Sequence, residues 1–127
     1  MSTRQKRRVV DKTAAYAVSR LNDECGTVFT NRGATGGVTF TLPTPNFSYL
    51  GDFYDFRGIA NFAVTVAGAT NGDIVTKNDA AANSVAASTA GEIIGAAIRA
   101  ECIRTGTDTY KWLVAGVAVG HTYTVAT

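Results

Sequence analysis

Long apolar runs and charged residues are both scarce in this sequence. Only 17% of its 127 residues are charged, so Thr, Ser, Asn and Gly must cover much of the surface. No apolar run approaches the roughly 18 residues that a membrane helix needs, and we expect no membrane partner. The basic N-terminus leads into no apolar signal core, so we expect a soluble protein that is made in the cytoplasm rather than secreted.

Cysteine and histidine are scarcer still, because the chain has two Cys and one His. A usual metal site takes about four ligands. His121, Cys25 and Cys102 cannot supply them, so we expect no metal and no cofactor. A Cys25–Cys102 disulfide would need an oxidising compartment, and without a secretion signal free thiols are favoured. We then expect Cys102 to be a small buried hydrophobe and Cys25 to lie beside a turn.

The net charge of +2 is unevenly distributed. Residues 1–12 hold five basic residues and one acidic residue, whereas the rest of the chain holds seven basic and nine acidic residues. The sequence therefore predicts an extended basic N-terminal arm over 1–12 and a single domain over 13–127. The basic residues that define the arm are Arg4, Lys6, Arg7 and Arg8. They could bind phosphates, dock on an acidic protein surface, or only solubilise the chain.

From Thr13 onward, short alternating segments separated by turns predict an antiparallel all-β domain, either a jelly-roll-like sandwich or a barrel. The expected strands are 13–18, 26–31, 38–43, 52–58, 61–69, 73–77, 94–102, 110–116 and 121–127. The residues Gly-Thr-Asp at 106–108 predict a turn before the strand 110–116. The alanine-rich stretch before Cys102 leaves a helix over 92–104 as the main alternative. Gly91 and Gly95 would each cost such a helix about 1 kcal/mol relative to Ala, which favours the strand.

Two glycine-containing segments are interpreted as turns. The segment 31–37, NRGATGG, resembles a phosphate-binding loop, but such a loop needs a following lysine and a helix N-terminus. Here a Val-Thr-Phe-Thr strand follows, so we predict a hairpin bend that joins 26–31 to 38–43. Asn71-Gly72 is a second hairpin signal, which would join 61–69 to 73–77.

No set of residues in the sequence indicates an enzyme. His121 is the only histidine, and no Ser or Cys near it has the signature of a nucleophile. The carboxylates that could form an acid–base pair, Asp52, Asp55, Glu92 and Glu101, are spread over different predicted elements. We therefore expect no catalytic residues and no enzymatic activity.

Aromatic residues are concentrated between 47 and 56, and Arg57 follows them. Such side chains could form a surface that stacks against sugars or single-stranded nucleic acid, with Tyr49 and Tyr54 as the candidates. The simpler interpretation is that alternate members fill the core and the others cover an edge. Trp112 is interpreted as a core residue rather than a ligand platform.

Three segments carry a family resemblance: GTVFTNRGATGGVTFTLPTP at 26–45, FAVTVAGATNGDIV at 62–75, and YKWLVAG with TYTVAT near the C-terminus. They resemble small β-rich virion proteins of tailed bacteriophages, most closely capsid decoration (cement) proteins. The resemblance covers residues 13–127 and implies an all-β homotrimer on the outer surface of the capsid, bound to the major capsid protein. It brings no catalytic residues, and it does not include the arm.

Three hypotheses follow from these observations. The first is a non-enzymatic protein that stabilises the phage capsid by bridging major capsid protein subunits, with Arg4, Lys6, Arg7 and Arg8 bound to acidic patches of the capsid or of a neighbouring protomer. The second is a head-fibre or tail-fibre module that binds host surface glycans. The third is a nucleic-acid-binding barrel, which the net charge of −2 on residues 13–127 disfavours.

Overall fold

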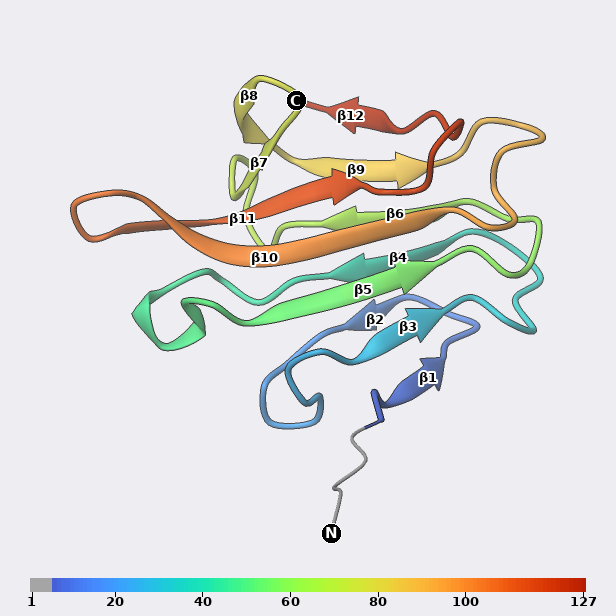
Figure 1. Ribbon diagram of the computed structural model, residues 1–127, viewed down its shortest axis with the longest axis horizontal. Coiled ribbons are helices and arrows are strands. Elements are labelled where there is room, and N and C mark those ends of the chain that lie inside the picture. The colour runs from blue at the N-terminus through green and yellow to red at the C-terminus, as the bar shows by residue number, and fades with distance from the viewer. Residues whose placement is uncertain (1–5) are drawn as a thin grey trace, which may run out of the picture.

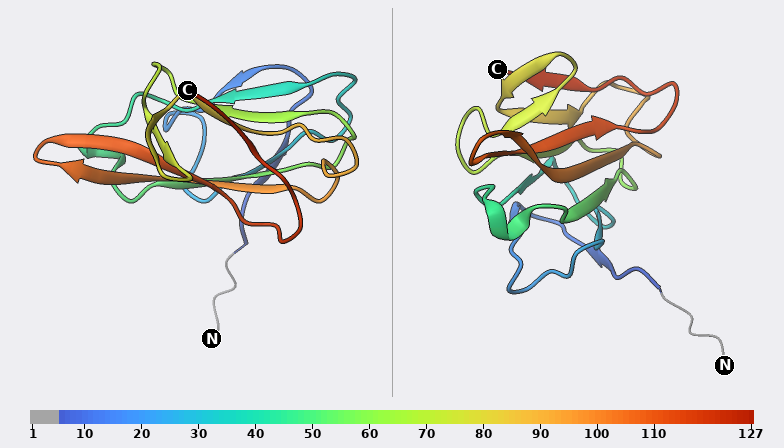
Figure 2. Two further views of the ribbon diagram at one scale, coloured as in Figure 1. Left: turned by 90° about the horizontal axis from the view of Figure 1, so that it is seen from above. Right: turned by 60° about the vertical axis from the view of Figure 1, so that its left-hand side comes forward.

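The computed structural model describes residues 6–127 and shows two β-sheets packed face to face (Figures 1 and 2). The prediction of an all-β, sandwich-like domain is confirmed. Helical structure within these residues is confined to the 3-10 turn η1 (Phe47–Tyr49), and no helix there is long and apolar enough to span a membrane.

The larger sheet has seven strands and the smaller sheet has five. In spatial order, the larger sheet contains β1 (Val9–Asp11), β3 (Val28–Thr30), β5 (Phe53–Arg57), β10 (Ala97–Gly106), β11 (Thr109–Gly116), β7 (Ile74–Thr76) and β8 (Asp79–Ala82). The smaller sheet contains β12 (Thr124–Ala126), β9 (Ser84–Ala87), β6 (Val64–Ala67), β4 (Val38–Thr41) and β2 (Tyr16–Ala17).

The sheets are mixed, so the prediction of antiparallel pairing throughout is wrong. Five of the ten strand pairs are parallel, namely β1–β3, β3–β5, β2–β4, β4–β6 and β7–β11. The reason is that the chain alternates between the two sheets from β1 to β7. From β3 to β6, each strand therefore lies beside the one two places earlier and runs in the same direction. The fifth parallel pair joins β7 to β11, because β10 and β11 lie between β5 and β7 in the larger sheet.

This alternation also overturns both predicted hairpins. The segment 32–37 joins β3 of the larger sheet to β4 of the smaller one, and Asn71-Gly72 joins β6 of the smaller sheet to β7 of the larger one. Both segments do turn the chain, and Gly72 has the positive φ of +90° that its turn requires. The turn predicted at 106–108 is a true hairpin, because it joins the antiparallel strands β10 and β11.

Strand β10 settles the choice between helix and strand in the alanine-rich region. Ile98, Ala100 and Cys102 are buried, whereas Arg99 and Glu101 between them are exposed. This period of two is the pattern of a strand with one face on the core. The predicted strand start was early, because Ile94 lies in the preceding loop and its side chain is 62% exposed.

Aromatic side chains from both sheets form the centre of the core. Phe29 stacks on Phe56 with ring centroids 5.5 Å apart, and Phe40 of the opposite sheet packs on Phe56 at 5.0 Å. Trp112 is fully buried, as predicted, and its Nε1 donates a hydrogen bond to the Pro43 carbonyl oxygen at 2.8 Å. Burying each such ring stabilises the fold by about 2 kcal/mol or more.

The sheet begins earlier than the predicted domain. Val9–Asp11 form β1, which pairs in parallel with β3 and places Val9 opposite Val28. Part of the predicted arm over 1–12 is therefore an edge strand, ahead of the predicted domain start at Thr13. Residues 1–5, and with them Arg4, lie outside the described residues.

Candidate interaction surfaces

Asp55 is a buried carboxylate on the outer face of the larger sheet. Its neighbours in β5, Tyr54 and Phe56, belong to the core, so Asp55 points to the other side. Its side chain is nevertheless 0% exposed, because arginine side chains cover it. Arg99 donates from Nε and Nη2 at 2.9 and 3.0 Å, and Arg7 Nη2 pairs with the same carboxylate.

The charges of this cluster hold the N-terminal segment on the sheet. Burial raises the pKa of Asp55, but the hydrogen bonds from Arg99 and Arg7 outweigh it and bring the pKa below its ordinary value. Both guanidinium groups also lie over the Phe53 ring, 5.5 Å (Arg7) and 5.2 Å (Arg99) from its centroid. Arg7 Nε further donates to the Gly26 carbonyl oxygen at 2.8 Å. We call Arg7, Asp55 and Arg99 the clasp, because their ion pairs attach the arm to the larger sheet.

This clasp changes the expected roles of the arm residues. Arg7 binds Asp55, and Arg8 Nη1 donates to the Asn22 carbonyl oxygen at 2.8 Å, so both cations bind their own domain. Lys6 is exposed. The structure thus assigns Arg7 and Arg8 to the attachment of the arm, and the prediction of an external contact stays untested for Lys6.

The two tyrosines that were predicted as surface contacts, Tyr49 and Tyr54, are both removed from the surface to different extents. Tyr54 is 0% exposed, and burial raises its pKa to about 12. The surface role predicted for Tyr54 is therefore wrong, because it occupies a core-facing position of β5. Tyr49 is half-buried and packs against Trp112, with ring centroids 6.1 Å apart. The exposed aromatic residue of this region is Phe47, at 69%.

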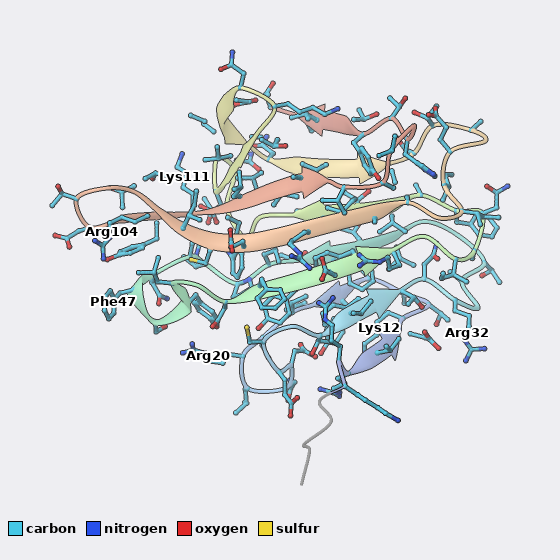
Figure 3. The ribbon with its side chains drawn as sticks, viewed as in Figure 1. Lys12, Arg20, Arg32, Phe47, Arg104 and Lys111 are labelled. Carbon is cyan, nitrogen blue, oxygen red and sulfur yellow. The ribbon has the colours of Figure 1, made fainter. Side chains whose placement is uncertain are left out.

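Phe47 forms one wall of a hollow at the tip of the β10–β11 hairpin, which we call the hairpin hollow. Its volume is about 530 Å³, and its lining consists of Phe47, Arg104, Gly106, Thr107, Asp108 and Tyr110. Figure 3 shows Arg104 and Phe47 at the same end of the molecule. Sequence reasoning missed this site, although the pairing of Arg104 with Tyr110 follows from the predicted turn at 106–108.

A group of exposed apolar side chains lies at the opposite end of the sandwich, and we call it the loop-end surface. Its members and their exposed fractions are Ile59 (48%), Phe62 (40%), Ile94 (62%), Val117 (54%) and Val119 (99%). They come from the loops β5–β6, β9–β10 and β11–β12, which gather at one end of the molecule (Figure 1). Exposed apolar patches of this kind often mark contact sites for other proteins.

Backbone hydrogen bonds hold these three loops together. The Gly58 amide donates to the Ala96 carbonyl at 3.0 Å, and the Gly95 amide donates to the Gly58 carbonyl at 2.7 Å. The Val117 amide donates to the Ala97 carbonyl at 2.8 Å. These hydrogen bonds connect the three loops to one another, so the loop-end surface is a single structural unit.

The structure does not join Cys25 to Cys102, so the candidate disulfide is absent from it. Cys25 is exposed, whereas Cys102 is buried and burial raises its pKa to about 11. The ring of His121 places Nδ1 2.6 Å from the Glu92 carbonyl oxygen. Among residues 6–127, no group of three or more His, Cys, Asp or Glu side chains is arranged to hold a metal ion.

Comparisons of this chain with protein-family models, with curated proteins and with solved structures find no match. The structural support for a function therefore comes from the arrangement of the chain's own residues.

Proposed function

We propose that this chain is a non-enzymatic structural protein of a tailed-bacteriophage virion. It decorates the outer surface of the capsid as a homotrimer and stabilises the capsid by bridging major capsid protein subunits. The phage setting is supported by the resemblance of residues 13–127. The bridging role is supported by one structural observation, the loop-end surface.

The loop-end surface has the properties of a protein contact. Its five large apolar side chains are exposed to water. Burying them against a partner would contribute about 25 cal/mol to the free energy of binding for each Å² of apolar surface removed from solvent. Because such a partner surface exists only on the assembled capsid, binding shifts the equilibrium toward the assembled form. A domain with few charged residues also meets little electrostatic penalty at such a contact.

The arm adds a second contact to this proposal. Arg7 and Arg8 bind their own domain, so Arg4 and Lys6 are the residues that we assign to acidic groups of the capsid or of a neighbouring protomer. A second contact on the same molecule strengthens binding through effective concentration. The double variant R4Q/K6Q leaves the Arg7–Asp55 clasp intact and should bind capsids more weakly. Binding as tight as that of the unmodified chain would rule out the arm contact.

The proposal as a whole is tested by the copy number of the protein in purified phage particles, measured by quantitative mass spectrometry. A high copy number that scales with the major capsid protein would support a decoration role. A few copies per particle would instead favour a fibre or neck component, and absence from the particle would overturn the virion assignment.

The loop-end contact is tested by binding to capsids that lack this protein. The double variant I94S/V119S removes two exposed apolar side chains, 62% and 99% exposed, and leaves the buried core unchanged. We expect about a tenfold loss of affinity or more. The matched control is L21S, since Leu21 is 93% exposed in the β2–β3 loop at the other end of the sandwich. Equal binding by I94S/V119S and L21S would show that the loop-end surface is not the contact.

A further inference from the structure

We propose that the hairpin hollow binds an acidic saccharide, meaning a sugar unit that carries a carboxylate. Arg104 receives the carboxylate, and Phe47 and Tyr110 pack against the C–H face of the sugar ring. Thr107 and Asp108 bond the sugar hydroxyl groups. This inference goes beyond the decoration role and does not depend on it, because the hollow and the loop-end surface lie at opposite ends of the sandwich.

The first wall of the hollow is built by the tip of the hairpin. The register of β10 and β11 shifts between Arg104 and Gly106, and such an irregularity re-aims the side chains beside it. Asp108 adopts a positive φ of +54° at the turn, and Thr109 Oγ1 donates to the Thr107 carbonyl oxygen at 3.2 Å. Arg104 and Tyr110 are direct cross-strand partners, with the guanidinium carbon 5.8 Å from the ring centroid.

The second wall is Phe47 in η1, and hydrogen bonds on both sides of Phe47 hold the backbone of this segment in place. Asn46 caps this turn, because its side-chain oxygen accepts from the Ser48 amide at 2.9 Å. The end of the segment is attached to β10 by two backbone bonds of 2.9 Å, from the Gly51 amide to the Cys102 carbonyl and from the Cys102 amide to the Asp52 carbonyl. A preformed site loses less free energy to ordering when it binds.

The chemistry of the lining selects a carboxylate and a flat apolar face. Among residues 6–127, no carboxylate lies within ion-pair distance of Arg104. A guanidinium group pairs with a carboxylate through two parallel hydrogen bonds. Phe47 is 69% exposed and meets Tyr110 edge to face, with centroids 6.3 Å apart and planes at 77°. Two such rings offer apolar surfaces, which suit the C–H faces of a pyranose.

Charge and size distinguish a saccharide from a nucleic acid. The lining contains one cation, Arg104, and one anion, Asp108, whereas strands of nucleic acid require several cations along a groove. Asp108 would repel the successive phosphates of a nucleic acid strand. A saccharide with one carboxylate can place that group on Arg104 and a hydroxyl group, which donates a hydrogen bond, on Asp108. The volume of about 530 Å³ lies within the range of small-molecule sites, roughly 300–1,000 Å³.

The experiment applies the full chain to an array of acidic oligosaccharides, each printed beside the same oligosaccharide with its carboxylates reduced to alcohols. We expect at least one acidic glycan to be bound about tenfold more strongly than its reduced counterpart, since a charge-assisted pair is lost on reduction. The array also carries single-stranded DNA. No bound acidic glycan, or equal binding of the acidic and reduced forms, would overturn the proposal, and so would binding of DNA alone.

Variants then locate the site. R104Q removes the cation and should weaken acidic-glycan binding about tenfold, and F47A should weaken both the acidic and the neutral forms. The control for charge is K111Q, which removes a cation of the same hairpin that is not part of the hollow (Figure 3). The control for apolar truncation is L21A. Binding by R104Q equal to that of K111Q would overturn the assignment to this hollow.

Capsid binding by the same variants separates this inference from the proposed function. R104Q and F47A should bind capsids as tightly as the unmodified chain, because neither residue belongs to the loop-end surface. Loss of glycan binding with retained capsid binding is the expected combination. If R104Q and F47A lose capsid binding and the unmodified chain binds no acidic glycan, the hollow is a protein contact and the saccharide proposal fails.

Discussion

Asn31 and Ala60 are joined by two reciprocal hydrogen bonds. Asn31 Nδ2 donates to the Ala60 carbonyl oxygen at 3.0 Å, and the Ala60 amide donates to Asn31 Oδ1 at 2.8 Å. The same side chain also accepts from the Ile59 amide at 2.7 Å and donates to the Phe62 carbonyl at 3.0 Å. Asn31 is fully buried, so one side-chain amide fixes the loop that presents Ile59 and Phe62.

Asn31→Asp tests this relationship. The substitution keeps the shape but replaces the amide nitrogen, which donates to two carbonyl oxygens, by an oxygen that repels them. We expect the free energy of unfolding to fall by about 3 kcal/mol, measured by urea denaturation. The control is Asn71→Asp at an exposed turn, which should change it by less than about 0.5 kcal/mol. If the two variants are equally stable, the amide of Asn31 does not hold the loop.

Asp55→Asn should change how stability depends on pH. The pKa of Asp55 is lowered in the folded protein, so the unfolded chain binds the proton more readily and stability rises with pH over this range. The contribution is fully present above the unfolded pKa of about 3.9 and is lost as pH falls through the lower folded pKa. We therefore expect D55N to be less stable than the unmodified chain by about 2–3 kcal/mol at pH 7, and this difference should vanish at low pH.

Denaturation curves at several pH values check this expectation. Asp108→Asn serves as control, because Asp108 is exposed at the β10–β11 turn and forms no ion pair with the described residues 6–127. A difference between D55N and the unmodified chain that stays constant from pH 7 down to pH 2 would contradict an ionised, clasped Asp55.

The strands could be predicted from the sequence because their pattern is local. The alternation through Ile98, Ala100 and Cys102 identifies a strand whatever lies beside it. The same alternation in β5 would have placed Tyr54 correctly, since Asp55 and Arg57 on one face leave Tyr54 and Phe56 for the core. The prediction of a surface Tyr54 failed because it rested on residue type rather than on position in the strand.

Sheet membership and the interaction surfaces could not be predicted in this way. The glycines of 32–37 indicate a change of direction, but they do not say which sheet the next strand joins, because this depends on which apolar faces are buried together. One wall of the hairpin hollow could be predicted, because the turn at 106–108 aligns Arg104 with Tyr110. Phe47 reaches it only through the β4–β5 connection, whose path depends on contacts far apart in sequence.

The two thiols should react at very different rates. Cys25 is exposed, whereas Cys102 is buried and its pKa is raised to about 11, so its reactive thiolate form is rare at neutral pH. We expect a thiol reagent to modify Cys25 quickly in the folded protein and Cys102 only after unfolding in urea, as followed by mass spectrometry. Equal rates in the folded state would contradict the burial of Cys102, and failure of both to react in urea would indicate a disulfide.

Gly116→Ala should destabilise the protein although Ala is the better residue in most strands. A Cβ atom at Gly116 would lie 2.1 Å from Cδ2 of Tyr123, well inside van der Waals contact. Tyr123 cannot move aside freely, because its hydroxyl group accepts from the Ala97 amide at 3.2 Å and donates to the Ala97 carbonyl at 3.0 Å. We expect a loss of about 2–3 kcal/mol in the free energy of unfolding.

The control for Gly116→Ala is Gly36→Ala, where an added Cβ would meet nothing within 4 Å. That variant should be as stable as the unmodified chain or slightly more stable, because it restricts the unfolded state. A double-mutant cycle with Tyr123→Ala identifies the cause. If the clash with the ring is responsible, Gly116→Ala should cost little once Tyr123 is Ala. An undiminished cost in that background would place the strain in the backbone of β11 instead.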